Sequence, residues 1–195
     1  MTDTLENPML DKIFLKARTH YNWTDKPVDD ALLQQVYDMA KMGPTAANSH
    51  PLRIVFVKTP EGKAKLKPCL APGNVDKTMA APVTAIFAHD LEFYEQLPKL
   101  LPHVDARSWY KGKPGSDETA FRNGSLEAGY FMLAARALGL DCGPMSGFDN
   151  AALDKAFFDG TSLRSNFICN LGYGDYDKLY PRSPRPDFAD FCKIV

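Results

Sequence analysis

Residues 118–139 read ETAFRNGSLEAGYFMLAARALG, a stretch that predicts one long helix. Four small residues cluster on it at helical spacing: Gly124, Ser125, Ala128 and Gly129. A glycine inside a helix costs ~1 kcal/mol relative to alanine. Two glycines in one helix therefore indicate that a second backbone packs closely against it.

Shorter elements flank the predicted long helix on both sides. Strands are predicted at 53–58 (RIVFVK), 82–88 (PVTAIFA) and 166–171 (NFICNL), with a short strand or turn at 141–145. Helices are predicted from Pro8, behind an Asn7 cap, to about residues 19–23, and at 28–42, 61–70, 76–80, 149–158 and 188–194. The strands lie far apart and do not alternate regularly with helices, so we expect an α+β fold.

Length and composition narrow the class of protein. A chain of 195 residues predicts a single domain over residues 1–195. Apolar residues make up 45% and charged residues 24%, and the net charge of -1 shows no excess of basic residues. Nucleic-acid binding and membrane-surface binding usually require such an excess. The longest apolar run, residues 79–88, is far shorter than the ~20 residues of a membrane span, so we expect no nucleic acid and no membrane among the partners.

Cysteine use and the first residues point to a reducing compartment. The four cysteines, Cys69, Cys142, Cys169 and Cys192, contain no C-x2-C pair, so no zinc site and no other metal site is expected. Residues 1–10 carry Asp3 and Glu6 where a secretory signal has basic residues. We expect a cytoplasmic protein with reduced thiols.

Several common motifs of nucleotide binding and hydrolysis are absent from the sequence. There is no G-x-G-x-x-G after a strand and no phosphate-binding G-x4-G-K-[ST] loop. The sequence also lacks H-E-x-x-H and G-x-S-x-G. These absences disfavour a dinucleotide fingerprint, metal catalysis and serine hydrolysis.

Residues 18–23, RTHYNW, follow the first predicted helix. A cation beside several hydrogen-bond donors is what a phosphate monoester needs, because its terminal oxygens accept charge-assisted hydrogen bonds. The alternative is an ordinary helix end, where Arg18 and His20 stabilise the carbonyl end of the helix dipole.

Residues 43–53, GPTAANSHPLR, connect a predicted helix to a predicted strand. Small residues between two prolines let a flat ligand approach the backbone, and Asn48 can both donate and accept hydrogen bonds. The alternative is a loop that only ends the helix, for which Gly43 and Pro44 would suffice.

Residues 142–148, CGPMSGF, and 172–175, GYGD, are loops bounded by glycine. Bare backbone N–H groups in such loops suit the electron-rich atoms of a ring. Arg182 and Arg185 follow them and could complete a phosphate site. Ordinary turn chemistry is the alternative for each loop.

Taken in order, these motifs carry a family resemblance. The set R-T-H-x-N-W, G-P-T-A-A-N-S-H-P-L-R, G-P-M-S-G, N-L-G-Y-G-D and Y-P-R-S-P-R resembles the FMN-dependent nitroreductase family, from about Leu10 to the C-terminus. Within that family the chain is most similar to the malonic semialdehyde (3-hydroxypropionate) reductase branch of pyrimidine degradation. The resemblance implies a central mixed, mainly antiparallel sheet flanked by helices. It also implies an intertwined homodimer whose two FMN sites are each built from both subunits.

The resemblance assigns roles to individual residues. The phosphate positions are Arg18, Thr19, His20 and Asn22, completed by Arg182 and Arg185. The loop lining the flavin comprises Pro44, Thr45, Ala46, Asn48 and His50, and the loop beside the flavin N5 edge comprises Pro144, Met145, Ser146 and Gly147. Residues 123–129 match the helix at the dimer interface. The chain departs from the family pattern where His20 replaces a common serine, Asn22 a basic residue and Leu52 a tryptophan, so the phosphate site is expected to depend on Arg182 and Arg185.

The activity that the resemblance implies is hydride transfer from NAD(P)H through flavin N5 to a small acceptor, malonic semialdehyde being reduced to 3-hydroxypropionate. No side chain is expected to be catalytic, because the cofactor carries the chemistry. Three alternatives stay open: a general nitroaromatic, quinone or enone reductase, a flavin-binding protein without catalysis, and a thiol-dependent enzyme using Cys142.

Residues 90–117 are expected to form a mobile segment on the substrate side. The segment contains three prolines and ends in RSWYKGKPGSD. Malonic semialdehyde carries a carboxylate, and Arg107, Tyr110 and Lys111 are the candidates to close over it. The alternative is a solvated loop with no role in binding.

Overall fold

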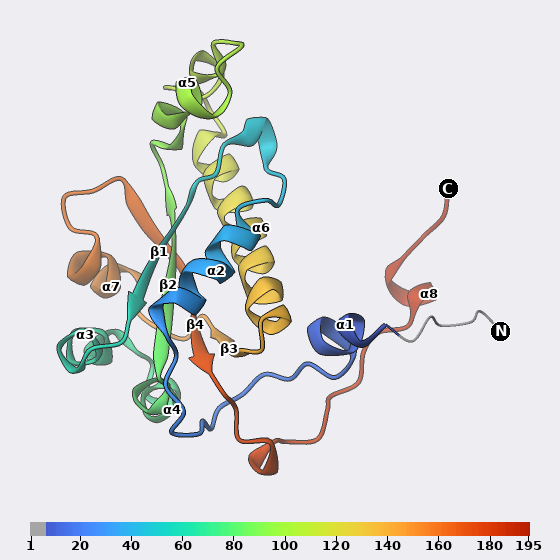
Figure 1. The fold of residues 1–195 in the computed structure, drawn as a ribbon. Coiled ribbons are helices and arrows are strands. Elements are labelled where there is room, and N and C mark those ends of the chain that lie inside the picture. The colour runs from blue at the N-terminus through green and yellow to red at the C-terminus, as the bar shows by residue number, and fades with distance from the viewer. Residues whose placement is uncertain (1–6) are drawn as a thin grey trace.

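A four-stranded antiparallel sheet forms the centre of the molecule in the computed structural model, which describes residues 7–195. The sheet order is β1-β2-β4-β3, from β1 (Leu52–Val57), β2 (Val83–Asp90), β4 (Leu163–Gly172) and β3 (Asp141–Met145) (Figure 1). All three strand pairs are antiparallel. The described part of the chain has one parallel contact, an isolated bridge between Thr19 and Cys142. The predicted α+β class is confirmed, and β1 and β3 are the edge strands.

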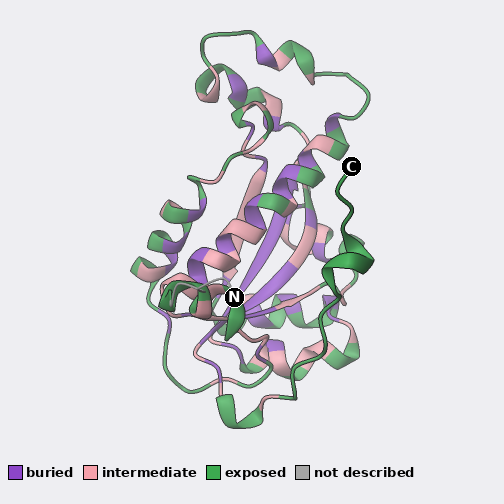
Figure 2. Ribbon diagram, turned by 90° about the vertical axis from the view of Figure 1, so that its right-hand side faces the viewer, coloured by how far each residue is buried: buried purple, intermediate pink, exposed green. Residues whose placement is uncertain are grey.

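Helices cover both faces of this sheet. Their bounds are α1 Pro8–Leu10, α2 Asp30–Ala40, α3 Pro60–Leu66, α4 Val75–Ala80, α5 Leu97–Leu100, α6 Ser116–Ala137, α7 Asn150–Phe157 and α8 Phe188–Phe191. Residues on β2 alternate between the two faces, as a strand requires. Val83, Ala85 and Phe87 pack with α2 and α6, whereas Ile86 and Ala88 pack with α3 and α7. Figure 2 shows the strands buried between these layers.

Several predicted elements have different bounds in the structure, among them the first helix and β4. The first helix, expected to end near residues 19–23, ends at Leu15 in a π-helical turn, Asp11–Leu15. The Lys16 N–H donates to the Asp11 carbonyl 2.7 Å away, five residues back, and the chain then extends to pair at Thr19. Strand β4 begins at Leu163 rather than residue 166, because it pairs with β2 as far as Asp90.

The small residues of α6 have separate explanations. A Cβ on Gly124 would lie 2.9 Å from the Cβ of His89, so this glycine lets α6 approach β2 closely within one chain. A Cβ on Gly129 would meet no atom within 4 Å. Close packing against a second backbone is therefore confirmed at Gly124, whereas the dimer contact expected around Gly129 stays a prediction.

Residues 90–117 fold into three short helical turns beyond the N-terminal end of α6 (Figure 1). Phe93 and Leu97 pack there with Ala106 and Ala120 in a small apolar cluster. The predicted irregular stretch thus has a core of its own.

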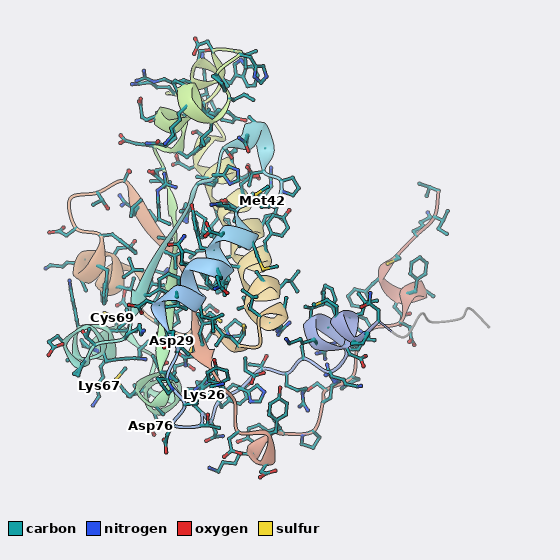
Figure 3. The ribbon with its side chains drawn as sticks, in the orientation of Figure 1. Lys26, Asp29, Met42, Lys67, Cys69 and Asp76 are labelled. Carbon is teal, nitrogen blue, oxygen red and sulfur yellow. The ribbon has the colours of Figure 1, made fainter. Side chains whose placement is uncertain are left out.

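The C-terminal residues run along the outside of the molecule, away from the sheet (Figure 2). Tyr180, Phe188 and Phe191 are all exposed there. Met42, labelled in Figure 3 just beyond the C-terminal end of α2, is also exposed. Within residues 7–195, no helix combines the length and the apolar character that crossing a membrane needs.

Candidate functional site

Four arginines from distant parts of the sequence line one cavity of about 390 Å³. Arg18 follows the first helix, Arg136 lies near the end of α6, and Arg182 and Arg185 belong to the C-terminal stretch. Thr19 lines the same cavity. The structure therefore brings together four residues predicted for the phosphate site and adds Arg136, which the sequence motifs missed.

These arginines bond to backbone carbonyls. Arg182 Nη2 donates to the carbonyls of Leu15 at 3.0 Å and Ala17 at 2.9 Å, and Arg18 Nη2 donates to the Tyr180 carbonyl. Arg136 Nη1 donates to the Ile13 carbonyl at 3.1 Å. None of the four forms an ion pair with a carboxylate of residues 7–195.

The positive charge of the cavity is therefore not neutralised by the described part of the chain. Arg136 Nε is in addition buried without a hydrogen-bond partner. A buried charged donor without a partner is costly, and an anion with several acceptor oxygens would satisfy it. The cavity is suited to a phosphate group.

His20 is buried and does not line this cavity. Its ring is fully buried, 3.4 Å from the Asp141 carboxylate, and it packs so closely on Gly174 that a Cβ there would lie 1.9 Å from Nδ1. Burial lowers the pKa of His20, while the nearby Asp141 acts in the opposite direction. The His20 side chain thus supports the loop that carries Arg18. Asn22, also predicted for the phosphate site, is exposed and does not line the cavity.

Strand β3 leads from the arginine cavity to the predicted flavin N5 loop. The bridge between Thr19 and Cys142 places the cavity beside the start of β3. At ~3.3 Å per residue, Met145 lies about 10 Å further along the strand. At the end of the loop, the Asn74 side chain donates to the Gly147 carbonyl at 2.7 Å, and a Cβ on Gly147 would lie 2.5 Å from the same nitrogen. This loop is closely packed and needs glycine.

The loop over residues 43–52 has an unusual backbone. Ala47, Asn48 and His50 have positive φ values of 53°, 52° and 40°. Left-handed conformations cost non-glycine residues roughly 1–2 kcal/mol each, so other interactions must hold this loop in place.

Helix α6 supplies those interactions through one of its faces. The Asn123 side-chain oxygen accepts from the Ala46 N–H at 2.8 Å, and the Tyr130 hydroxyl donates to the Pro44 carbonyl at 3.1 Å. Between them, Glu127 contacts His50 Nδ1 at 2.7 Å and accepts from the Leu52 N–H at 2.9 Å. The sequence motifs missed these three α6 residues, although their spacing of four and three positions places them on one helical face.

A second cavity, of about 640 Å³, opens beside this loop. His50, Arg53 and Glu127 line it, together with Tyr37 from α2 and Lys41, the residue that follows α2. Its cations have carboxylate partners, since Arg53 pairs with Asp90 at 2.8 Å and Lys41 with Asp38 at 2.5 Å. In contrast to the arginine cavity, this one has largely compensated charge.

The predicted flavin residues therefore divide into two groups within one chain. The arginine cavity lies at the C-terminal end of α6, and loop 43–52 packs on the middle of the helix, from Asn123 to Tyr130. Glu127 and Arg136 are nine residues apart, which at ~1.5 Å per residue is about 14 Å along the helix. Within one chain, the phosphate residues and loop 43–52 therefore contact different turns of α6.

The predicted substrate residues have partners of their own. Arg107 and Lys111 both bind Glu95, at 2.6 Å and 2.9 Å, and Tyr110 stacks edge-on against Phe93 with ring centroids 5.0 Å apart. None of Arg107, Tyr110 and Lys111 lines either cavity described above. The geometry does not support their predicted contact with a substrate carboxylate, because the Glu95 carboxylate already pairs with both Arg107 and Lys111.

The thiol alternative also finds no support in the geometry. The Cys142 side chain is buried in the core beside β4 and contacts the Met132 carbonyl at 3.8 Å. A thiol must be accessible to act as a nucleophile. Residues 7–195 contain no group of three or more histidine, cysteine or acidic side chains placed to hold a metal ion.

Residues 15–173 match the nitroreductase family. The chain belongs to this family. A protein of Burkholderia lata, provisionally named NADH dehydrogenase/NAD(P)H nitroreductase, is 62% identical over 192 residues, with 98% of each chain covered. The family predicted from the five motifs is confirmed.

Solved structures confirm the nitroreductase fold at much lower identity. A provisionally named nitroreductase of Exiguobacterium sibiricum, determined in complex with FMN, superposes with a TM-score of 0.84 at 20% identity, covering 94% of this chain and 96% of that one. An enone reductase of gut-bacterial fatty acid saturation metabolism superposes with a TM-score of 0.83 at 19% identity, covering 97% and 99%. These similarities extend over almost the whole of each chain.

Proposed function

We propose that this nitroreductase binds FMN and catalyses hydride transfer from NAD(P)H to a small acceptor. The observation that carries the proposal is the cavity lined by four arginines with no carboxylate partner among the described residues. When bound, FMN supplies the redox chemistry, accepting a hydride from NAD(P)H and passing it on. The FMN-bound neighbour and the name of the Burkholderia relative agree with this proposal.

The chain's own residues have distinct tasks in this proposal. Arg18, Thr19, Arg182 and Arg185 hold the phosphate, and Arg136 adds a fourth guanidinium. The buried His20 supports the Arg18 loop. The 144–147 loop and the 44–50 loop would present backbone and small side chains to the flavin ring.

A homodimer completes the site in this proposal. The family resemblance implies FMN sites built from both subunits, so loop 43–52 of one subunit is proposed to meet the phosphate residues of the other. Exposed apolar side chains on α6 and after α2 offer the contact surface: Phe121, Leu126 and Met42. Gly129, with open space around it, lies on the same helix.

The acceptor is proposed from two lines of argument. The resemblance in the motifs favours malonic semialdehyde, whose carboxylate needs a free cation. The paired state of Arg53, Arg107 and Lys111 instead favours an uncharged acceptor such as a nitroaromatic, a quinone or an enone. The fold shared with an enone reductase is compatible with the second class.

The visible spectrum of the purified protein is the first test. The proposal expects a yellow protein, or one that turns yellow on reconstitution with FMN, and bleaching on anaerobic addition of NADPH or NADH. Bound flavin that neither donor bleaches would indicate a flavin-binding protein without catalysis. Absence of flavin binding even after reconstitution would refute the proposal.

The acceptor is then tested with the reduced protein. Malonic semialdehyde, a nitroaromatic, a quinone and an enone are added separately under anaerobic conditions. Flavin reoxidation by the semialdehyde with formation of 3-hydroxypropionate would support the first acceptor class. Reoxidation only by the uncharged compounds would support the second.

A further inference from the structure

Lys63, on α3, carries an ammonium group that is buried in the protein. The residue is 9% exposed, and its Nζ donates to the Thr78 carbonyl of α4 at 2.7 Å and to Thr84 Oγ1 of β2 at 2.8 Å. No ion pair among residues 7–195 includes Lys63. Burying a charge without an opposite charge costs free energy, so this side chain is a poor choice for stabilising the core alone.

The surroundings of Lys63 are polar but not charged. Burial lowers the pKa of Lys63 from the ordinary 10.5 to about 8, so the side chain is mostly an ammonium group at neutral pH. On α3 and α4, the other charged side chains either are exposed or lie over an aromatic ring: Glu61, Lys65 and Asp76 are exposed, and Lys77 lies over Tyr21.

The two strands beneath Lys63 place their titratable residues elsewhere. His89, Asp90 and Arg164 lie at the other end of β2 and β4 from Thr84. Cys169 packs on the opposite face of the sheet, in the core formed with α2 and α6. The acceptors of Lys63 are therefore a neutral carbonyl and a neutral hydroxyl.

Four residues close a ring of hydrogen bonds around this ammonium group. Thr84 Oγ1, which accepts from Lys63, donates to Asn170 Oδ1 of β4 at 2.8 Å. Asn170 Nδ2 in turn donates to Thr78 Oγ1 at 3.3 Å, and the Thr78 carbonyl accepts from Lys63. The ring joins two helices, α3 and α4, to two strands at one end of the sheet (Figure 1).

The ring holds α4 at its C-terminal end. The last four carbonyls of a helix have no partner within the helix. In α4, Lys63 binds the Thr78 carbonyl, and Asn170 Nδ2 binds the Lys77 carbonyl at 3.2 Å. A helix of six residues is too short to be stable by itself, so α4 depends on these contacts.

Helix α4 also contacts the loop predicted beside the flavin. Asn74, which directly precedes α4, donates through Nδ2 to the Gly147 carbonyl at 2.7 Å. The Ala71 N–H donates to the same carbonyl at 3.0 Å. Within the helix, Thr78 Oγ1 lies 3.6 Å from Met145 Sδ and donates a weak hydrogen bond to it. The position of residues 145–147 therefore depends on α4 and the turn before it.

We propose that Lys63 is a positioning residue for the flavin site: its buried ammonium group fixes α4, and α4 fixes the loop over residues 145–147. This inference rests on the proposed function, in which that loop lies beside the flavin. It makes part of the site geometry depend on a side chain that lines neither of the two cavities described above.

The pH dependence of stability tests the buried charge. Between pH 8 and 10.5 the unfolded chain binds more protons at Lys63 than the folded chain does, so this residue's contribution to stability rises with pH. Lys63→Met removes that contribution. We expect the urea midpoint of the parent protein, relative to that of Lys63→Met, to rise over this interval. A constant difference between the two midpoints would overturn the buried charge.

Amide hydrogen exchange in FMN-free protein tests the positioning role. The reporter is the Ala71 N–H, which bonds to Gly147. We expect its exchange to be about 10-fold faster in Lys63→Met, the scale of one lost charged hydrogen bond, and exchange at Ala46 to be unchanged. The matched control Lys67→Met removes an exposed ammonium group and should alter neither rate. Equal rates at Ala71 in the parent and Lys63→Met, or an equal rise at Ala46, would overturn the positioning role.

A second variant keeps the test decisive if Lys63→Met does not fold. Thr84→Val has nearly the same shape as the parent residue and removes one of the two acceptors of Lys63. We expect exchange at Ala71 to be several-fold faster in Thr84→Val than in the parent, because the ring is then open. An unchanged rate in this variant would count against the proposal in the same way.

FMN titration then connects α4 to the proposed function. We expect Lys63→Met to bind FMN about 10-fold more weakly than the parent, and Lys67→Met to bind it equally well. Asn74→Ala frees the Gly147 carbonyl directly and should also weaken binding. Because both changes release one loop, the double variant should bind FMN about as well as the weaker single variant. Losses that add in full would overturn the route through α4.

The two proposals fail in different ways. If the parent bound no FMN at all, the proposed function would fail, while the exchange and pH results still decided whether Lys63 positions the loop. If the parent bound FMN and Lys63→Met bound it equally well, the proposed function would stand and the role of Lys63 in the flavin site would be refuted.

Discussion

Two groups of basic side chains, both expected from the sequence to bind an anion except for Arg136, differ in what surrounds them. Arg18, Arg136, Arg182 and Arg185 meet around one cavity and bond to backbone carbonyls. Arg107 and Lys111 instead share the carboxylate of Glu95. The first group keeps its charge available for a ligand, whereas the second group has most of its charge neutralised.

The difference shows that a cluster of cations is not by itself an anion site. Exposed ion pairs contribute little to stability, but they occupy the donors that a ligand would need. A backbone carbonyl orients a guanidinium without cancelling its charge. The partner of each cation therefore decides which cluster can bind a phosphate.

The largest expected effect is at the arginine cavity. The double variant Arg18→Ala/Arg182→Ala removes two charged donors and should weaken FMN binding by about 100-fold or more, since each such hydrogen bond contributes ~1.5–3 kcal/mol. Quenching of flavin fluorescence measures the affinity. The control is Arg107→Ala, which should leave the affinity for FMN nearly unchanged. An equal loss of FMN affinity in Arg107→Ala would show that the two groups of cations do not differ in their capacity to bind the phosphate.

The buried support of the loop that carries Arg18 gives the next effect. Gly174→Ala would place a Cβ 1.9 Å from His20 Nδ1, so the loop that carries His20 must shift. We expect a loss of about 2–3 kcal/mol in unfolding free energy, the scale of overpacking in a core. Urea unfolding provides the measurement. Gly73→Ala, where a Cβ meets no atom within 4 Å, should be nearly neutral, and a loss there as large as at Gly174 would contradict this reasoning.

The pH dependence of stability sharpens the role of His20. Burial lowers its pKa below the ordinary 6.5, so below pH 6.5 the unfolded chain binds more protons than the folded one. Stability should fall as pH falls from 6.5 toward the lowered value, and then level off. His20→Gln should flatten this dependence in urea midpoints, leaving the part due to buried His89, whose pKa burial also lowers. An unaltered slope would mean that His20 is not protonated differently in the two states.

The smallest effect is expected at Arg107 and Lys111, which share the carboxylate of Glu95. Arg107→Ala and Lys111→Ala should change the KM for a carboxylate-bearing acceptor by less than about 2-fold, because exposed and paired cations interact weakly with further anions. Steady-state kinetics with malonic semialdehyde checks this, with an uncharged acceptor as the reference. A several-fold rise in KM for the semialdehyde alone would show that these residues do bind the substrate carboxylate.

Much of the fold follows from local pattern. The long helix, the 82–88 strand and the α+β class were predictable because apolar spacing and chain breakers act over a few residues. The early end of the first helix at Leu15 was not, because it depends on a strand contact between Thr19 and Cys142. The start of β4 at Leu163 likewise depends on its partner strand.

The sequence by itself determined the family, the fold class and the set of polar residues from which a site is built. These follow from motifs that are short, ordered and readable without coordinates. The tertiary structure decided which cations are free, that Glu127 faces His50, and that the two groups of predicted flavin residues contact different turns of α6. Charge compensation and protonation depend on distances of a few ångströms between residues as far apart as His50 and Glu127, and no local pattern encodes such distances.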